Sequence, residues 1–66
     1  MKNNIRVERA IINITQEELA NRIAVSRQTI NAMEANKYVP STILALKIAK
    51  VFGKKVEDIF ILEKHD

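Results

Sequence analysis

The sequence feature that most constrains the fold is TQEELANRIAVSRQTI, residues 15–30, where two helix-forming segments are separated by three residues. Thr15 and Glu18 match a capping box, in which each side chain satisfies a backbone N–H at the start of a helix. Ser26 supplies the cap of a second helix. Helices joined by so short a turn cross steeply, and the small Ala20 and Ala24 allow the close approach that such a crossing needs.

Similar start and stop signals divide the rest of the chain. Asn3 or Asn4 caps a first helix, and Asn13 ends it, because asparagine tolerates the left-handed backbone of a helix terminus. The helix that Ser26 begins runs to about Ala35. The residue that follows it, Asn36, suits a second left-handed exit.

Two more helices follow an extended link at Val39–Pro40. Ser41 or Thr42 caps the fourth helix and Gly53 ends it, while the fifth covers residues 56–62. The polar tail, residues 63–66, is expected to fray. In each expected helix the apolar residues recur at helical spacing and so share one side. Together these sides predict one core, made of Ile5, Ile12, Ile14, Leu19, Ala20, Ile23, Val25, Ile30, Met33, Leu44, Ile48, Val51, Phe52, Val56, Ile59 and Phe60. We therefore expect one all-α unit over residues 1–66.

Composition limits the classes of function. With 66 residues and no cysteine, stability must come from apolar packing, within one copy or shared with a second, rather than from disulfides or thiolate metal sites. His65 stands alone in the tail and Gly53 is the sole glycine, so neither a catalytic constellation nor a phosphate loop is present. We expect no enzyme, cofactor, metal, small-molecule ligand or membrane partner, and a cytoplasmic location. The net charge of +3 is compatible with a polyanionic partner.

The third helix has an outer face that is unusual for a merely solvated surface. Gln28, Asn31, Ala32 and Ala35 lie opposite its apolar side, with Arg27 at one edge. A face that only meets water more often carries lysine and glutamate. Amides and arginine form paired hydrogen bonds with base edges, and small side chains let a helix approach a groove wall closely. This face therefore predicts nucleic-acid contact, with a solvated helix face as the alternative.

Several segments together carry a resemblance that extends over nearly the whole chain. IRVER, TQEELA, VSRQTI, KYVPS, LALKIAKVFG and VEDIF stand in the order and spacing of one family. The chain resembles the lambda-repressor/Cro-type helix-turn-helix regulators, also called the xenobiotic-response-element type. The resemblance implies a compact five-helix lambda-repressor-like domain, with the helix-turn-helix at residues 16–35. It also implies sequence-specific binding of double-stranded DNA.

The resemblance further implies individual roles. Base contacts fall to Arg27, Gln28 and Asn31, with Ala32 near a thymine methyl group. Phosphate contacts fall to Gln16, Ser26, Asn36, Lys37, Tyr38 and Ser41. Two of these have alternatives: Gln16 as a simple helix-start residue, and Tyr38 as a hydrophobic lid over the core.

Arg9 and Glu34 face inward by helical position, and the family often pairs residues at these places. We expect an ion pair between them, the alternative being two independent surface charges. The family usually has glycine where Ala24 stands, so the turn must avoid a positive φ or tolerate strain. Lys55 stands where a Ser or Thr cap is common, which leaves the fifth helix without a capping side chain.

The function expected from these features is that of a transcriptional regulator, most often a repressor, acting as a homodimer on a palindromic operator. Ile61 and Leu62 are the favoured dimer contacts, with Val7 and Ile11 second; the alternative for Val7 and Ile11 is that they are isolated surface residues. A rival function is a protein-interaction module, such as an antitoxin or a regulator subunit, that uses the helix-turn-helix as a scaffold.

Overall fold

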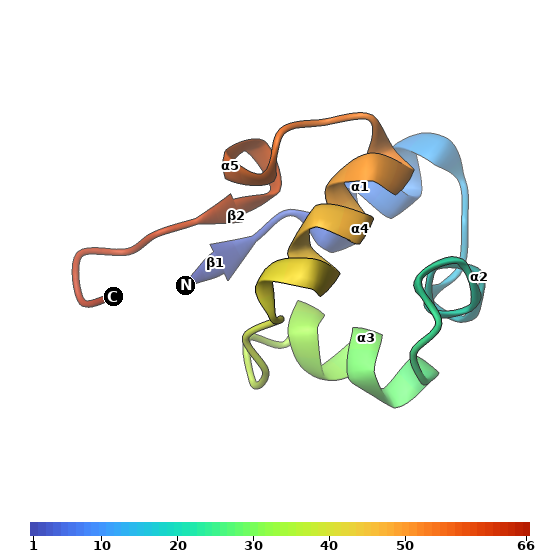
Figure 1. Ribbon diagram of the computed structural model, residues 1–66, viewed down its shortest axis with the longest axis horizontal. Coiled ribbons are helices and arrows are strands. Elements are labelled where there is room, and N and C mark those ends of the chain that lie inside the picture. Colours follow the sequence, from blue (N-terminus) through green and yellow to red (C-terminus); the bar gives the residue numbers. More distant parts are fainter.

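A computed structural model describes all 66 residues and shows five short helices around one core (Figure 1). The helices are α1 (Ile5–Ile12), α2 (Gln16–Ile23), α3 (Arg27–Glu34), α4 (Thr42–Phe52) and α5 (Val56–Ile59). Two short strands, β1 (Lys2–Asn3) and β2 (Phe60–Ile61), accompany them. The predicted all-α, five-helix architecture is confirmed. No helix is long and apolar enough to cross a membrane.

The helix starts follow the capping signals of the sequence. Thr15 Oγ1 accepts the Glu18 N–H at 3.0 Å, and Glu18 Oε1 accepts the Thr15 N–H at 3.3 Å, so the capping box is complete. Ser26 caps α3 and Ser41 caps α4 through hydrogen bonds of 3.2 Å each. Asn4 occupies the cap position of α1 but its side chain makes no capping bond, and Asn3 Oδ1 instead accepts the Ile5 N–H. Lys55 provides no capping bond for α5, as expected.

Four helices end in the same way, with one residue in the left-handed conformation. These residues are Asn13 (φ 57°), Ala24 (φ 59°), Asn36 (φ 60°) and Gly53 (φ 63°). In each case the following N–H bonds back to the carbonyl five residues earlier, as Val25 does to Ala20 at 3.0 Å. Of the two possibilities at Ala24, the structure shows the strained one, because an alanine Cβ disfavours this conformation.

The C-terminal segment corrects the expected extent of the fifth helix. The fifth helix stops at Ile59 instead of Leu62, and Phe60 and Ile61 pair antiparallel with Asn3 and Lys2. The backbone is drawn into this pairing because the Asn4 N–H donates to the Ile59 carbonyl at 2.8 Å. In the polar tail, the Met1 ammonium group pairs with Glu63 at 3.2 Å and with Asp66 at 3.0 Å.

The core contains most of the residues predicted to face inward. Twelve apolar residues are buried, and Val25, Leu44, Val51 and Val56 pack against them while partly exposed. Ile12 is an error in the prediction, because its side chain is 39% exposed. The helix ends at this residue, and the left-handed Asn13 turns the chain so that Ile14 enters the core instead. Ile30 and Met33 are both fully buried and pack α3 against the core.

Candidate nucleic-acid interface

Helix α3 lies along one edge of the molecule (Figure 1), and one side of it is exposed and polar. Arg27, Gln28 and Asn31 are exposed and line a shallow depression of about 300 Å³ with no hydrophobic residue in it. They stand three and four residues apart, so their side chains share one side of the helix. Ala32, beside them, is half-buried. The structure thus brings together the four residues expected to contact bases and leaves three of them open to solvent.

The orientation of this face follows from what lies beneath it. Ile30 and Met33 have no exposed surface, so α3 has no freedom to rotate without exposing core residues. Helix α2 packs directly against α3 across the turn at Ala24 and Val25. The two helices therefore form one rigid unit, with the polar face of α3 directed away from the core.

A buried carboxylate fixes the far end of α3. The Glu34 side chain is 1% exposed and accepts two hydrogen bonds from Arg9, at 2.6 Å from Nε and 3.1 Å from Nη2. Arg9 Nη1 also donates to the Ile14 carbonyl at 3.0 Å. Arg9 is 16% exposed, so this is a largely buried, two-pronged ion pair between α1 and α3.

The surroundings of Glu34 keep it ionised. Burial alone would raise the pKa of the carboxyl, but hydrogen bonds from Arg9 and Gln16, together with the Arg9 charge, outweigh it, so the pKa of Glu34 lies below its ordinary value. Arg6, one turn before Arg9, adds a longer contact of 3.5 Å from an exposed position. The sequence analysis did not identify Arg6 as a partner of Glu34, although its spacing from Arg9 places it on a neighbouring face of α1.

Gln16 lies between the buried ion pair and the exposed face. Its Nε2 donates to Glu34 Oε1 at 3.1 Å and to Asn31 Oδ1 at 3.4 Å. Gln16 is half-buried at the first position of α2. In this structure, the amide nitrogen that was expected to reach a phosphate therefore has two side-chain acceptors within the protein, of which the Glu34 carboxylate is the nearer.

The segment after α3 continues the polar surface. Asn36, Lys37, Tyr38 and Ser41 are exposed, as is Ser26 at the start of the helix. Tyr38 is 42% exposed and lies outside the core cluster, which does not support the alternative of a lid. Asn3 Nδ2 donates to the Met33 carbonyl at 2.7 Å and to Asn36 Oδ1 at 3.0 Å. This tie between the N-terminal strand and the end of α3 gave no signal in the sequence beyond the capping role considered for Asn3.

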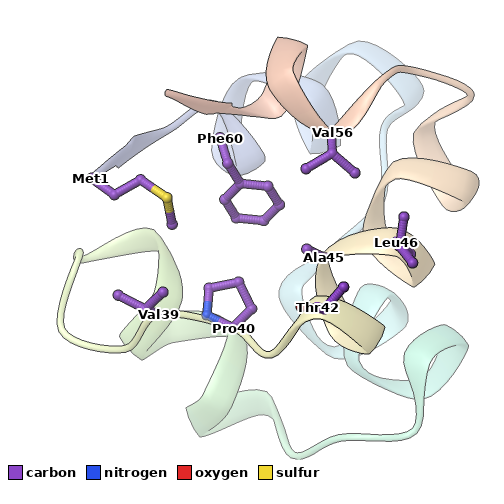
Figure 2. Close-up of a pocket in the computed structure, with 8 residues that line it drawn as sticks. All are labelled: Met1, Val39, Pro40, Thr42, Ala45, Leu46, Val56 and Phe60. Carbon is purple, nitrogen blue, oxygen red and sulfur yellow. The ribbon is translucent and has the colours of Figure 1, made fainter. Parts of the chain in front are cut away.

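Apolar side chains are exposed on three other parts of the surface. The first, here called the α4 groove, has a volume of about 380 Å³ (Figure 2) and is lined by Met1, Val39, Pro40, Thr42, Ala45, Leu46, Val56 and Phe60. The second, the C-terminal patch, consists of Ile61 and Leu62. The third, the α1 patch, consists of Val7 and Ile11, which are 56% and 65% exposed.

Comparison with known proteins agrees with this geometry. The helix-turn-helix family model matches residues 5–59, from the start of α1 to the end of α5. The chain is 60% identical over 63 residues to an uncharacterized HTH-type transcriptional regulator of Methanocaldococcus jannaschii, covering 96% of each protein. It is 47% identical over 66 residues to the HTH-type transcriptional regulator YgzD of Bacillus subtilis, covering each completely. The chain therefore belongs to the helix-turn-helix family.

Proposed function

We propose that this protein is a transcriptional regulator that binds double-stranded DNA in a sequence-specific manner. The observation that carries the proposal is the exposed face of α3, where Arg27, Gln28 and Asn31 stand together on a helix whose other side is locked into the core. The relatives named above are HTH-type transcriptional regulators, which supports the same function here. Proteins of this family act by binding, and the chain is not an enzyme.

In the proposed complex, α3 lies in the major groove. The groove is about 12 Å wide and admits one helix, and it presents a different pattern of donors and acceptors for each base pair. Arg27 and Gln28 stand at the first two positions of α3, where side chains of a recognition helix reach base edges. Asn31 follows one turn later, and Ala32 offers a methyl group at close range.

Phosphate contacts are proposed for the residues that flank this face. Ser26 precedes α3, while Asn36, Lys37, Tyr38 and Ser41 form the exposed segment that follows it. The side-chain oxygen Oδ1 of Asn36 accepts a hydrogen bond from Asn3, which leaves the side-chain NH2 group of Asn36 as a donor for a phosphate oxygen. Gln16 is proposed for the same role from its place at the start of α2, where its Nε2 now donates to Glu34 and Asn31.

A homodimer is part of the proposal. The molecule measures 31 × 22 × 20 Å, whereas half-sites of a palindromic operator are about 34 Å apart, so one copy reaches only one of them. Two copies related by a two-fold axis would place two α3 helices on one face of the duplex. Such a dimer bound across a promoter would repress transcription by occlusion.

The α4 groove and the adjoining C-terminal patch suit a second copy of this chain. A two-fold interface must be complementary to itself, so it needs both a hollow and projecting apolar side chains. The groove supplies the hollow, while Val39 at its rim and Ile43, one turn before Leu46, are each 66% exposed. The α1 patch lacks a hollow and remains the second choice, as in the sequence analysis.

Selection of bound duplexes from a random DNA pool tests the function. We expect enrichment of a palindrome, and we expect Gln28→Ala to relax the preference at one base pair in each half-site. With one cationic phosphate contact per subunit, from Lys37, raising the salt concentration from 50 to 200 mM should reduce the affinity of the dimer roughly 10-fold. Absence of DNA binding, or binding insensitive to salt, would instead favour the rival protein-interaction module.

Sedimentation equilibrium tests the dimer and its surface. Leu46→Asp places a charge at the α4 groove on a side chain that is 57% exposed, so the monomer should fold while dimerisation is lost. Leu62→Asp should weaken the dimer less, and Ile11→Asp serves as the control on the α1 patch. A wild-type protein that stays monomeric at high micromolar concentration would remove the dimer, and dissociation by Ile11→Asp alone would move it to α1.

A further inference from the structure

Arg6 is the least firmly held of the groups that surround the Glu34 carboxylate. Its Nε lies 3.5 Å from Glu34 Oε1, whereas Arg9 and Gln16 donate to the same carboxylate at 2.6–3.1 Å. The Arg6 side chain is 76% exposed, and neither of its terminal nitrogens has a hydrogen-bond partner in the protein. An ionised carboxylate has about four acceptor sites, and the three shorter bonds occupy most of them. Arg6 can therefore leave Glu34 at little cost to the fold.

Arg6 also carries a charge that no carboxylate nearby neutralises. Arg9 and Glu34 form a one-to-one ion pair that is almost closed to solvent. Glu34 is the only carboxylate within 4.0 Å of Arg6, so the three groups together carry a net positive charge, and it lies on the exposed member. A guanidinium with free N–H groups presents two parallel donors to a phosphate. The local charge and the free donors therefore both favour an anion at Arg6.

The position of Arg6 brings this charge next to the residues proposed to contact DNA. Glu34 is the last residue of α3, and Lys37 lies in the exposed segment that follows. Arg6 Nε and Gln16 Nε2 both lie within 3.5 Å of the same Glu34 oxygen, so a guanidinium from α1 stands beside the amide that opens α2. Because the major groove is bounded by phosphates on both sides, a duplex seated on α3 carries its backbone past the neighbouring elements.

We propose that Arg6 is a phosphate contact contributed by α1, and that its guanidinium turns from Glu34 to the DNA backbone when α3 enters the major groove. The inference rests on the proposed DNA-binding function and adds a contact from a helix outside the helix-turn-helix. Glu34 keeps both bonds from Arg9 during this exchange, so α3 stays fixed while Arg6 changes its partner.

The salt dependence of DNA binding reports the number of such contacts. Arg6 together with Lys37 gives two cationic phosphate contacts per subunit. The affinity of the dimer should then fall roughly 100-fold between 50 and 200 mM salt, instead of the roughly 10-fold expected from Lys37 alone. Arg6→Ala should restore the roughly 10-fold dependence and should weaken binding to all duplexes alike, with base preference unchanged.

Lys54→Ala is the matched control for the loss of one charge. Lys54 is exposed in the link between α4 and α5, which lies at the opposite edge of the molecule from α3 (Figure 1). This variant should keep the salt dependence of the wild type, and so should Arg6→Lys, which retains the charge. Circular dichroism checks folding. Should Arg6→Ala be unfolded, Arg6→Gln replaces it, because glutamine removes the charge and keeps an amide donor for Glu34.

Uncharged methylphosphonates, placed at single positions of the selected duplex, locate the contact. We expect one position in each half-site at which this replacement weakens binding of the wild type but has no further effect on Arg6→Ala. Such a result would assign the lost contact to one phosphate and not to the overall charge of the protein.

Each contrary outcome has a distinct meaning. An Arg6→Ala variant that binds DNA with the salt dependence of the wild type would overturn the inference. An equal change in Lys54→Ala would also overturn it, because net charge and not a local contact would then set the salt dependence. A wild type that binds no DNA would instead refute the proposed function itself.

Discussion

Replacing Arg9 by alanine tests the physical account of how α3 is held. The substitution leaves the Glu34 carboxylate, 1% exposed, without the two hydrogen bonds from Arg9 and also removes the bond from Arg9 to the Ile14 carbonyl. Removing one partner of a buried pair typically costs about 3–5 kcal/mol, because the remaining charge is poorly solvated. Gln16 and Arg6 still donate to Glu34, so we expect the lower end of that range, roughly 3 kcal/mol.

A loss of this size is large for so short a chain. At roughly 0.05–0.15 kcal/mol per residue, a 66-residue protein has a free energy of unfolding of about 3–10 kcal/mol. The melting temperature should therefore fall by roughly 12–24 °C, given about 4–8 °C per kcal/mol in a domain of this size. Thermal and urea unfolding followed by circular dichroism measure the change, at one fixed protein concentration because dimerisation would add to the stability.

Arg6→Ala is the matched control. Arg6 contacts the same carboxylate on the same helix, but at 3.5 Å and with a side chain that is 76% exposed. Exposed ion pairs contribute about 0–1 kcal/mol, so this variant should unfold close to the wild type. Equal losses for Arg9→Ala and Arg6→Ala would refute the argument that burial, and not the charge pair alone, sets the cost.

Three further predictions follow from the same structure. Because the pKa of Glu34 is lowered in the folded state, the ionised carboxyl stabilises the fold fully when the pH is above the ordinary pKa of 4.5. This stabilisation is lost as the pH falls through the lowered pKa, so the free energy of unfolding measured from pH 6 to 3 should fall more steeply for the wild type than for Glu34→Gln. Ala24→Gly should raise the free energy of unfolding by roughly 0.5–1 kcal/mol in urea titrations, since glycine adopts φ 59° without strain. Lys37→Ala should weaken binding to all duplexes alike and reduce the slope of log affinity against log salt by about one per subunit.

Local signals predicted the helices well because their causes lie within a few residues. The capping box at Thr15, the serine caps and the left-handed exits all depend on contacts between residues three to five apart, which a sequence displays directly. The two strands could not be found this way. Lys2 pairs with Ile61 from the opposite end of the chain, and each strand has only two residues, too few for an alternating pattern.

The exposed face of α3 was predicted for the same reason, since helical spacing alone places Arg27, Gln28 and Asn31 together. The hydrogen bonds of Gln16 were not predicted. They depend on the distance between two helices and on the rotamers of three side chains, which neither periodicity nor family resemblance specifies. Ile12 shows a similar limit, because its exposure follows from where the helix stops and not from its position on the helical stripe.

Glu34 both stabilises the fold and, through Gln16, contacts the exposed amide of Asn31. An isolated surface asparagine rotates freely, and a hydrogen bond to another exposed side chain constrains it little, because water competes for both groups. Asn31 differs because its partner Gln16 is itself held by a charged, almost fully buried acceptor. Glu34→Gln should accordingly affect both properties: it removes the charge that Arg9 neutralises, and it replaces an acceptor-only group by an amide whose NH2 group can face Gln16. Competition mobility shifts at a temperature where this variant remains fully folded should therefore show weaker discrimination at the base pair that Asn31 contacts; unchanged discrimination would mean that Glu34 only stabilises the fold.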